Sequence, residues 1–133
     1  MTAEEKKELV DKLTAMAGMK IEIKQQKRRL EALKNNNEET TWDIKEIEKL
    51  EKDIDQLTKE YNLLDEAINN VSDPVKREVL RMRYIDNATW KAIAYEFFNT
   101  EEEFCEEIER YIRRCYDLRN AALQEILTYT KSH

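Results

Sequence analysis

Side chains that could carry out catalytic chemistry are scarce in this sequence. The single histidine is the last residue, His133, so no histidine is left for a catalytic triad, a zinc site or a proton shuttle. The single glycine, Gly18, excludes the glycine-rich loops that bind the phosphates of dinucleotides or nucleoside triphosphates. We therefore expect no enzymatic activity, no cofactor and no bound metal ion.

The two cysteines, Cys105 and Cys115, are predicted to lie in one helix. Ten residues separate them, which corresponds to ~15 Å along a helix axis and is too far for a disulfide. Neither has a histidine or a loop context that would activate its thiol. Reduced, unreactive thiols are typical of a cytoplasmic protein, and from the charged N-terminus and the absence of a long apolar run we expect a cytoplasmic protein without a secretory signal or transmembrane segment.

Basic side chains near the C-terminus could bind phosphates. Residues 73–133 hold 10 basic and 12 acidic residues, and six of the acids lie within residues 100–109. Without that segment the net charge is +4, which predicts a basic surface. We expect Lys91 and Arg110 to hold phosphates and Arg119 to belong to the same surface. If this surface binds DNA, as the resemblance described below implies, Arg113, Arg114 and Tyr116 are best placed to reach base edges. The alternative for the arginines is pairing with Glu106, Glu109 or Asp117 on a solvated helix.

The elements that position these side chains are predicted to be helices. Charged residues make up 39% of the 133 residues, and the chain has one glycine and one proline. This composition is typical of an all-α protein. Tight β-hairpins need residues that tolerate positive φ, so the single glycine also argues against a β-sandwich or barrel.

Residues 1–72 are predicted to form an antiparallel two-helix coiled-coil hairpin. Thr2 and Glu5 have the spacing of a capping box, and the helix that they start is expected to run to Lys34 with a local bend or a close helix approach at Gly18. The apolar stripe of this helix contains Leu9, Met16, Met19, Ile23, Leu30 and Leu33. Asparagines 35–37 indicate a turn. A second helix, starting near Thr40 or Thr41, carries the stripe Ile47, Leu50, Ile54, Leu57, Tyr61, Leu64, Ile68 and Val71.

This hairpin is interpreted as a structural and oligomerising arm. Each helix of a two-helix hairpin buries only one stripe, so we expect the arm to pack on the rest of the chain or on a second copy as a homodimer. A coiled coil dedicated to another partner is the alternative. Trp42, near the tip, is expected to pack onto the first helix.

Residues 73–133 are predicted to form a three-helix, helix-turn-helix unit. Asp73 and Pro74 have the residue types of a helix N-terminus, and Thr89 is expected to cap a short second helix. Thr100 and Glu103 have capping-box spacing and predict a last helix from about Glu101 to Thr128. A helix, a tight turn and a short helix followed by a long one is the order of a helix-turn-helix.

The most informative motif in this unit is the ordered set Leu80-x-x-Arg83-Tyr84-Ile85-Asp86-Asn87-x-Thr89-Trp90-x-x-Ile93-Ala94. It resembles the helix-turn-helix of sigma factor region 4. It is most similar to the version in the ArpU/RinA-like late-transcription regulators of phages. Residues 112–123 also resemble the recognition helix of those proteins. The resemblance implies a regulator that binds double-stranded DNA, RNA polymerase or both. It also implies that Leu80 and Tyr84 pack under Trp90 and Ile93.

An acidic segment at residues 100–109 departs from this resemblance. It is expected to extend the recognition helix at its N-terminal end, where six carboxylates would face the phosphates of DNA. The alternative function is therefore a protein-binding inhibitor or adaptor, including a mimic of DNA, that works through Glu102, Glu103 and Glu106. A cation site in this segment is disfavoured because no oxygen-rich loop accompanies the carboxylates.

Overall fold

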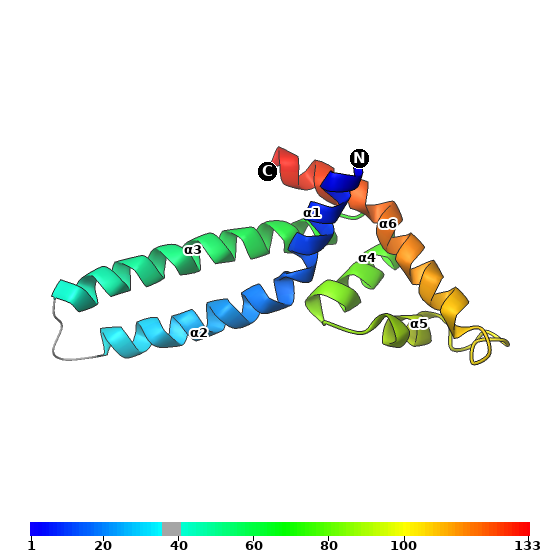
Figure 1. Ribbon diagram of the computed structural model, residues 1–133, viewed down its shortest axis with the longest axis horizontal. Coiled ribbons are helices and arrows are strands. Elements are labelled where there is room, and N and C mark those ends of the chain that lie inside the picture. Colours follow the sequence, from blue (N-terminus) through cyan, green and yellow to red (C-terminus); the bar gives the residue numbers. More distant parts are fainter. Residues whose placement is uncertain (36–40) are drawn as a thin grey trace.

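The computed structural model describes residues 1–35 and 41–133, and all regular elements in these residues are helical, which confirms the predicted all-α class (Figure 1). The N-terminal helices are α1 (Ala3–Thr14), α2 (Met16–Lys34) and α3 (Thr41–Asn69). The C-terminal elements are α4 (Pro74–Leu80), the π-helical turn η1 (Arg81–Ile85), α5 (Trp90–Phe98) and α6 (Ile108–Ser132). Within the described ranges no helix is both long and apolar enough to cross a membrane.

Helices α2 and α3 run side by side in opposite directions and form an arm that projects from the rest of the molecule (Figure 1). The described members of both predicted apolar stripes are buried or half-buried, because each stripe faces the interior. An ion pair of 3.0 Å between Lys34 and Glu51 links the two helices near the tip. Asn36, Asn37, Thr40 and the side chain of Trp42, for which we also made predictions, lie outside the described residues.

The first helix breaks at Ala15, and the predicted bend near Gly18 is wrong. Gly18 lies inside α2, where an added Cβ would meet no atom within 4 Å. The capping box of Thr2 and Glu5 is present as predicted. At the other end of α1, the hydroxyl of Thr14 donates to the carbonyl of Val10 at 2.7 Å. Threonine hydroxyls that bond backward in this way bend helices, which accounts for the position of the break.

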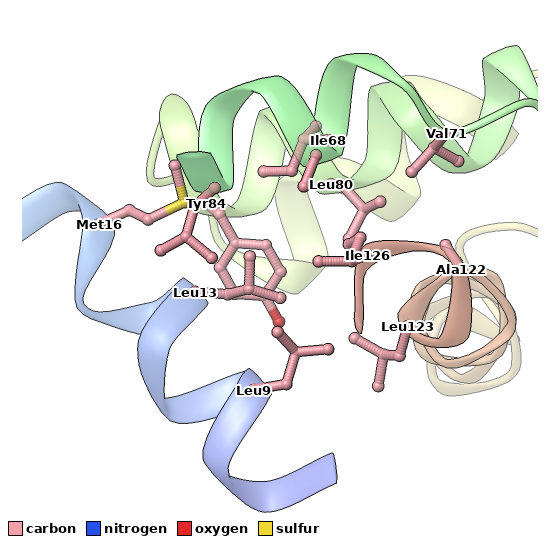
Figure 2. Close-up of a cluster of buried hydrophobic side chains, with 12 residues drawn as sticks. Leu9, Leu13, Met16, Ile68, Val71, Leu80, Tyr84, Ala122, Leu123 and Ile126 are labelled. Carbon is pink, nitrogen blue, oxygen red and sulfur yellow. The ribbon is translucent and has the colours of Figure 1, made fainter. Parts of the chain in front are cut away.

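The main hydrophobic core joins the arm to the C-terminal unit (Figure 2). Residues from both sides of the division that we predicted at residue 72 fill it. Its buried members come from α1 to α4, the loop between α3 and α4, η1 and α6, and are Leu9, Leu13, Met16, Leu64, Ala67, Ile68, Val71, Leu80, Tyr84, Ala122, Leu123 and Ile126. The base of the arm is therefore packed on the same side chains that hold α6.

A second core lies inside the C-terminal unit, between α4, α5 and α6. Val79, Ile93, Ala94, Phe104, Tyr111 and Cys115 are its buried members. The prediction that Leu80 and Tyr84 pack under Trp90 and Ile93 is wrong, because both belong to the first core and Val79 takes that place. Consecutive residues of a helix point about 100° apart, so Val79 and Leu80 serve different cores.

The predicted start signals of the helix-turn-helix are confirmed. Asp73 caps α4 by accepting from the backbone N–H of Val75 at 2.8 Å, and Pro74 is the first helical residue. Thr89 caps α5 by accepting from the N–H of Ala92 at 3.1 Å. Between them Asn87 has a φ of 57°, a conformation that asparagine tolerates better than most residues.

Candidate nucleic-acid interface

The N-terminal end of α5 is held against α6 by stacked aromatic and guanidinium groups. The rings of Trp90 and Tyr116 stack with centroids 4.4 Å apart. The guanidinium of Arg119 lies 5.3 Å from the Trp90 ring and 5.2 Å from the Tyr116 ring. The guanidinium of Arg83 also lies over the Trp90 ring, 5.0 Å from its centroid. Arg83 donates a hydrogen bond to the carbonyl of Ala88 at 3.0 Å. These four side chains, which we call the Trp90 cluster, link η1, α5 and α6 through stacking and cation–π contacts.

The Trp90 cluster was only partly predictable. Tyr116 and Arg119 are three residues apart, a spacing that places two side chains on one side of a helix. Nothing in the spacing of Arg83 and Trp90, which lie on opposite sides of the turn, indicates that they meet. The Trp90 side chain is half-buried and packs against the second core.

The C-terminal end of α5 is held by a second aromatic group. Phe98 and Phe104 both contact Tyr111, with ring centroids 5.2 and 5.6 Å apart. Phe104 also meets the edge of Tyr95 at 5.9 Å and is only 5% exposed. The Arg114 guanidinium lies 5.7 Å from the rings of Phe98 and Tyr111. Phe104 thereby anchors the acidic segment to both helices.

Contrary to our prediction, the acidic segment does not extend the last helix, α6, at its N-terminal end. Residues 100–107 form consecutive turns and α6 begins at Ile108, so Thr100 and Glu103 cap no helix. Cys105 consequently lies outside the helix that contains Cys115. Continuous helix would place glutamates four residues apart, as at Glu102 and Glu106, and such like-charged pairs destabilise a helix. Tight turns also let Phe104 reach the aromatic rings of α5 and α6.

The residues predicted to bind DNA have different surroundings. Lys91, Arg113 and Arg114 are exposed and, in the described part of the chain, form no ion pair. Arg110 is also exposed but pairs with Glu107 at 2.8 Å, and this hydrogen bond raises the pKa of Arg110. The arginines 110, 113 and 114 follow one another on the exposed side of the first turns of α6.

Tyr116 and Arg119 are the two predicted DNA-binding residues that belong to the Trp90 cluster. Tyr116 is 37% exposed, and its ring contacts both Trp90 and the Arg119 guanidinium. Arg119 is half-buried and donates to the hydroxyl of Tyr84 at 3.2 Å and to the side chain of Asn120 at 3.1 Å. The predicted pairing of Arg113, Arg114 and Arg119 with acidic neighbours is not present among the described contacts.

The side chains of the alternative, protein-binding surface are also exposed. Glu102, Glu103 and Glu106 face solvent on the turns that precede α6. In the described ranges no group of three or more His, Cys, Asp or Glu side chains is arranged to hold a metal ion. Burial raises the pKa of the Cys115 thiol to about 11, so this thiol stays protonated at neutral pH.

We predict that Phe104→Ala releases the acidic segment from α5 and α6. Removing a buried phenylalanine costs about 3 kcal/mol of stability when the site cannot collapse. Hydrogen exchange at residues 100–107 is expected to accelerate, while the amides in the middle of α6 stay protected. The exposed neighbour Cys105→Ser is the control. Unchanged exchange at residues 100–107 would show that Phe104 does not anchor the segment.

The fold and this surface define a helical protein in which an arm is joined to a unit with the layout of a helix-turn-helix. No family model, curated protein or solved structure matches the chain.

Proposed function

We propose that this protein is a phage-type transcription regulator that binds double-stranded DNA through α5 and α6. The observation that carries the proposal is the exposed row of arginines at the start of α6, in which Arg113 and Arg114 have no ion-pair partner among the described residues. Helix α6 is then the recognition helix, and its first turns enter the major groove.

The proposed roles of the side chains follow from their exposure and from the contacts that hold Arg119 in place. Lys91 at the start of α5 and Arg110 contact phosphates, and Arg113, Arg114 and Tyr116 reach base edges. Arg119 is a positioning residue, because its guanidinium is held between Trp90, Tyr116 and the Tyr84 hydroxyl. The geometry of the acidic segment is compatible with these roles. Five of its six carboxylates precede α6 instead of lying on it.

A mobility-shift assay on DNA flanking the protein's own gene, at two salt concentrations, tests the proposal. We expect a complex at low salt that weakens steeply as salt rises, because counterions are released from the contacted phosphates. Absence of any complex at low salt, with the protein folded, would exclude this function.

We also propose that two copies associate through the arm, since two recognition helices would then read two half-sites of an operator. Light scattering is expected to give twice the chain mass of 16.0 kDa. A single 16.0 kDa species over a wide concentration range would contradict a homodimer.

The second candidate is a protein-binding inhibitor or adaptor, favoured by the anchoring of the acidic segment through the buried Phe104. An anchored row of exposed carboxylates would fit a basic surface on RNA polymerase or a nuclease. In that case Glu102, Glu103 and Glu106 are the working residues and Arg113 and Arg114 contribute little.

A further inference from the structure

Helix α2 carries a concentration of positive charge that the helix-turn-helix does not use. Residues 20–34 hold six basic and two acidic residues in a chain whose net charge is −6. Lys20, Lys24, Lys27 and Arg28 follow the spacing that places side chains on one side of a helix. We call these four residues the α2 stripe. All four are exposed.

The charges of the α2 stripe are not neutralised inside the arm. The apolar positions of α2, such as Ile23 and Leu30, are half-buried and occupy the side toward α3, so the stripe points away from that seam. In the described residues the ion pair between α2 and α3 is made by Lys34, and none of the four stripe residues forms one. Glu31 is the carboxylate on the same side and lies toward the tip.

A polyanion suits this surface better than an acidic face of a second copy. Exposed ion pairs between proteins gain little free energy, because salt screens them and long side chains must be ordered. A nucleic-acid backbone instead releases condensed counterions for every phosphate that a cation neutralises. Four unpaired cations on one rigid helix therefore favour binding to a regular array of phosphates.

We propose that the α2 stripe binds the phosphate backbone of double-stranded DNA, next to the segment that α5 and α6 contact. This inference rests on the proposed function, because it places the arm on the same duplex. The arm projects from the helix-turn-helix (Figure 1), and the 19 residues of α2 span ~28 Å. The stripe itself, from Lys20 to Arg28, spans ~12 Å, so at ~3.4 Å per base pair it adds phosphate contacts over ~4 base pairs on one side.

The test compares a stripe variant with a control variant of equal charge. The stripe variant is Lys20→Gln, Lys24→Gln and Arg28→Gln, and the control is Lys45→Gln, Lys49→Gln and Lys52→Gln on the exposed side of α3. Each lost phosphate contact lowers the slope of log K against log salt by ~0.9. We expect the stripe variant to lose ~2.7 units of slope, so that the fall in affinity between 50 and 200 mM salt becomes about 40-fold smaller. The control is expected to keep the slope.

Duplex length and a second variant separate this inference from the proposed function. The stripe variant should bind a duplex of about 15 base pairs like wild type. On a duplex of about 30 base pairs it should show the reduced salt slope, since only the longer duplex reaches the arm.

An unchanged salt slope on both duplexes, with Arg113→Ala and Arg114→Ala abolishing binding, would overturn the inference and leave the proposed function standing. A reduced slope with no effect of the arginine variant would support the stripe and overturn α6 as the recognition helix. Loss of a dimer without a change in slope would assign the stripe to a second copy and overturn the inference.

Discussion

The double variant Arg113→Ala and Arg114→Ala is expected to bind DNA between about thirtyfold and about twenty-thousandfold more weakly than wild type. Each arginine that makes a bidentate contact to a base contributes about 1–3 kcal/mol of discrimination. Both side chains are exposed, and neither takes part in an ion pair in the described part of the chain. Their removal should therefore change binding much more than stability. Arg114 contacts Phe98 and Tyr111, so a small loss of stability at that position is expected.

A mobility-shift titration at several salt concentrations measures this effect. The salt slope should fall by about one unit for every contact to a phosphate that the variant loses. The matched control is Lys45→Ala and Lys49→Ala on α3, which removes the same charge far from the proposed interface. Equal affinity of the arginine variant and wild type, with both proteins folded, would exclude α6 as the recognition helix.

The triple variant Glu102→Gln, Glu103→Gln and Glu106→Gln tests the acidic segment in the same DNA-binding assay. If α6 enters DNA, removal of three nearby carboxylates should strengthen binding modestly by reducing repulsion. If the acidic segment is the working surface, the same variant should lose its protein partner, and the arginine variant should retain it. The two variants together therefore distinguish a DNA-binding regulator from a protein-binding adaptor.

The second large effect is expected for Leu123→Asp, which should unfold the arm and the helix-turn-helix together. Leu123 is 1% exposed and lies in the core that joins α1, α3, α4 and α6 (Figure 2). Truncation of a buried leucine alone costs about 2–5 kcal/mol, and an unpaired buried charge adds to that cost. For a domain of this size the total is a large part of the stability.

Urea denaturation followed by circular dichroism and by tryptophan fluorescence measures this coupling. Because one core serves both parts, the two signals should change at the same urea concentration in wild type and in the milder variant Leu123→Ala. Ala121→Asp, at an exposed position of the same helix, is the control. Separate transitions for the arm and for the C-terminal unit would show that residues 1–72 fold independently.

Local signals in the sequence were accurate where a helix depends on its own residues. The capping residues Thr2, Asp73 and Thr89 begin helices as predicted, because a side-chain oxygen and the first free N–H groups lie within a few residues. The seam of α3 is likewise visible in the sequence, since burial of one side imposes the three-and-four spacing of Leu50, Ile54 and Leu57. Thr100 carries the same capping pattern and begins no helix. There, repulsion between glutamates and the anchoring of Phe104 outweigh the local preference.

The sequence by itself therefore determined the all-α class, most helix boundaries, the hairpin seam and the chemical types available for binding. Tertiary structure alone decided the assignment of Leu80 and Tyr84 to the core shared with the arm, and the meeting of Arg83, Trp90, Tyr116 and Arg119. It also decided which arginines stay free at the start of α6. Capping and periodicity act over one or two helical turns, whereas these contacts join residues brought together by helix crossing angles. Those angles follow from how whole side-chain surfaces pack, and no short sequence pattern contains them.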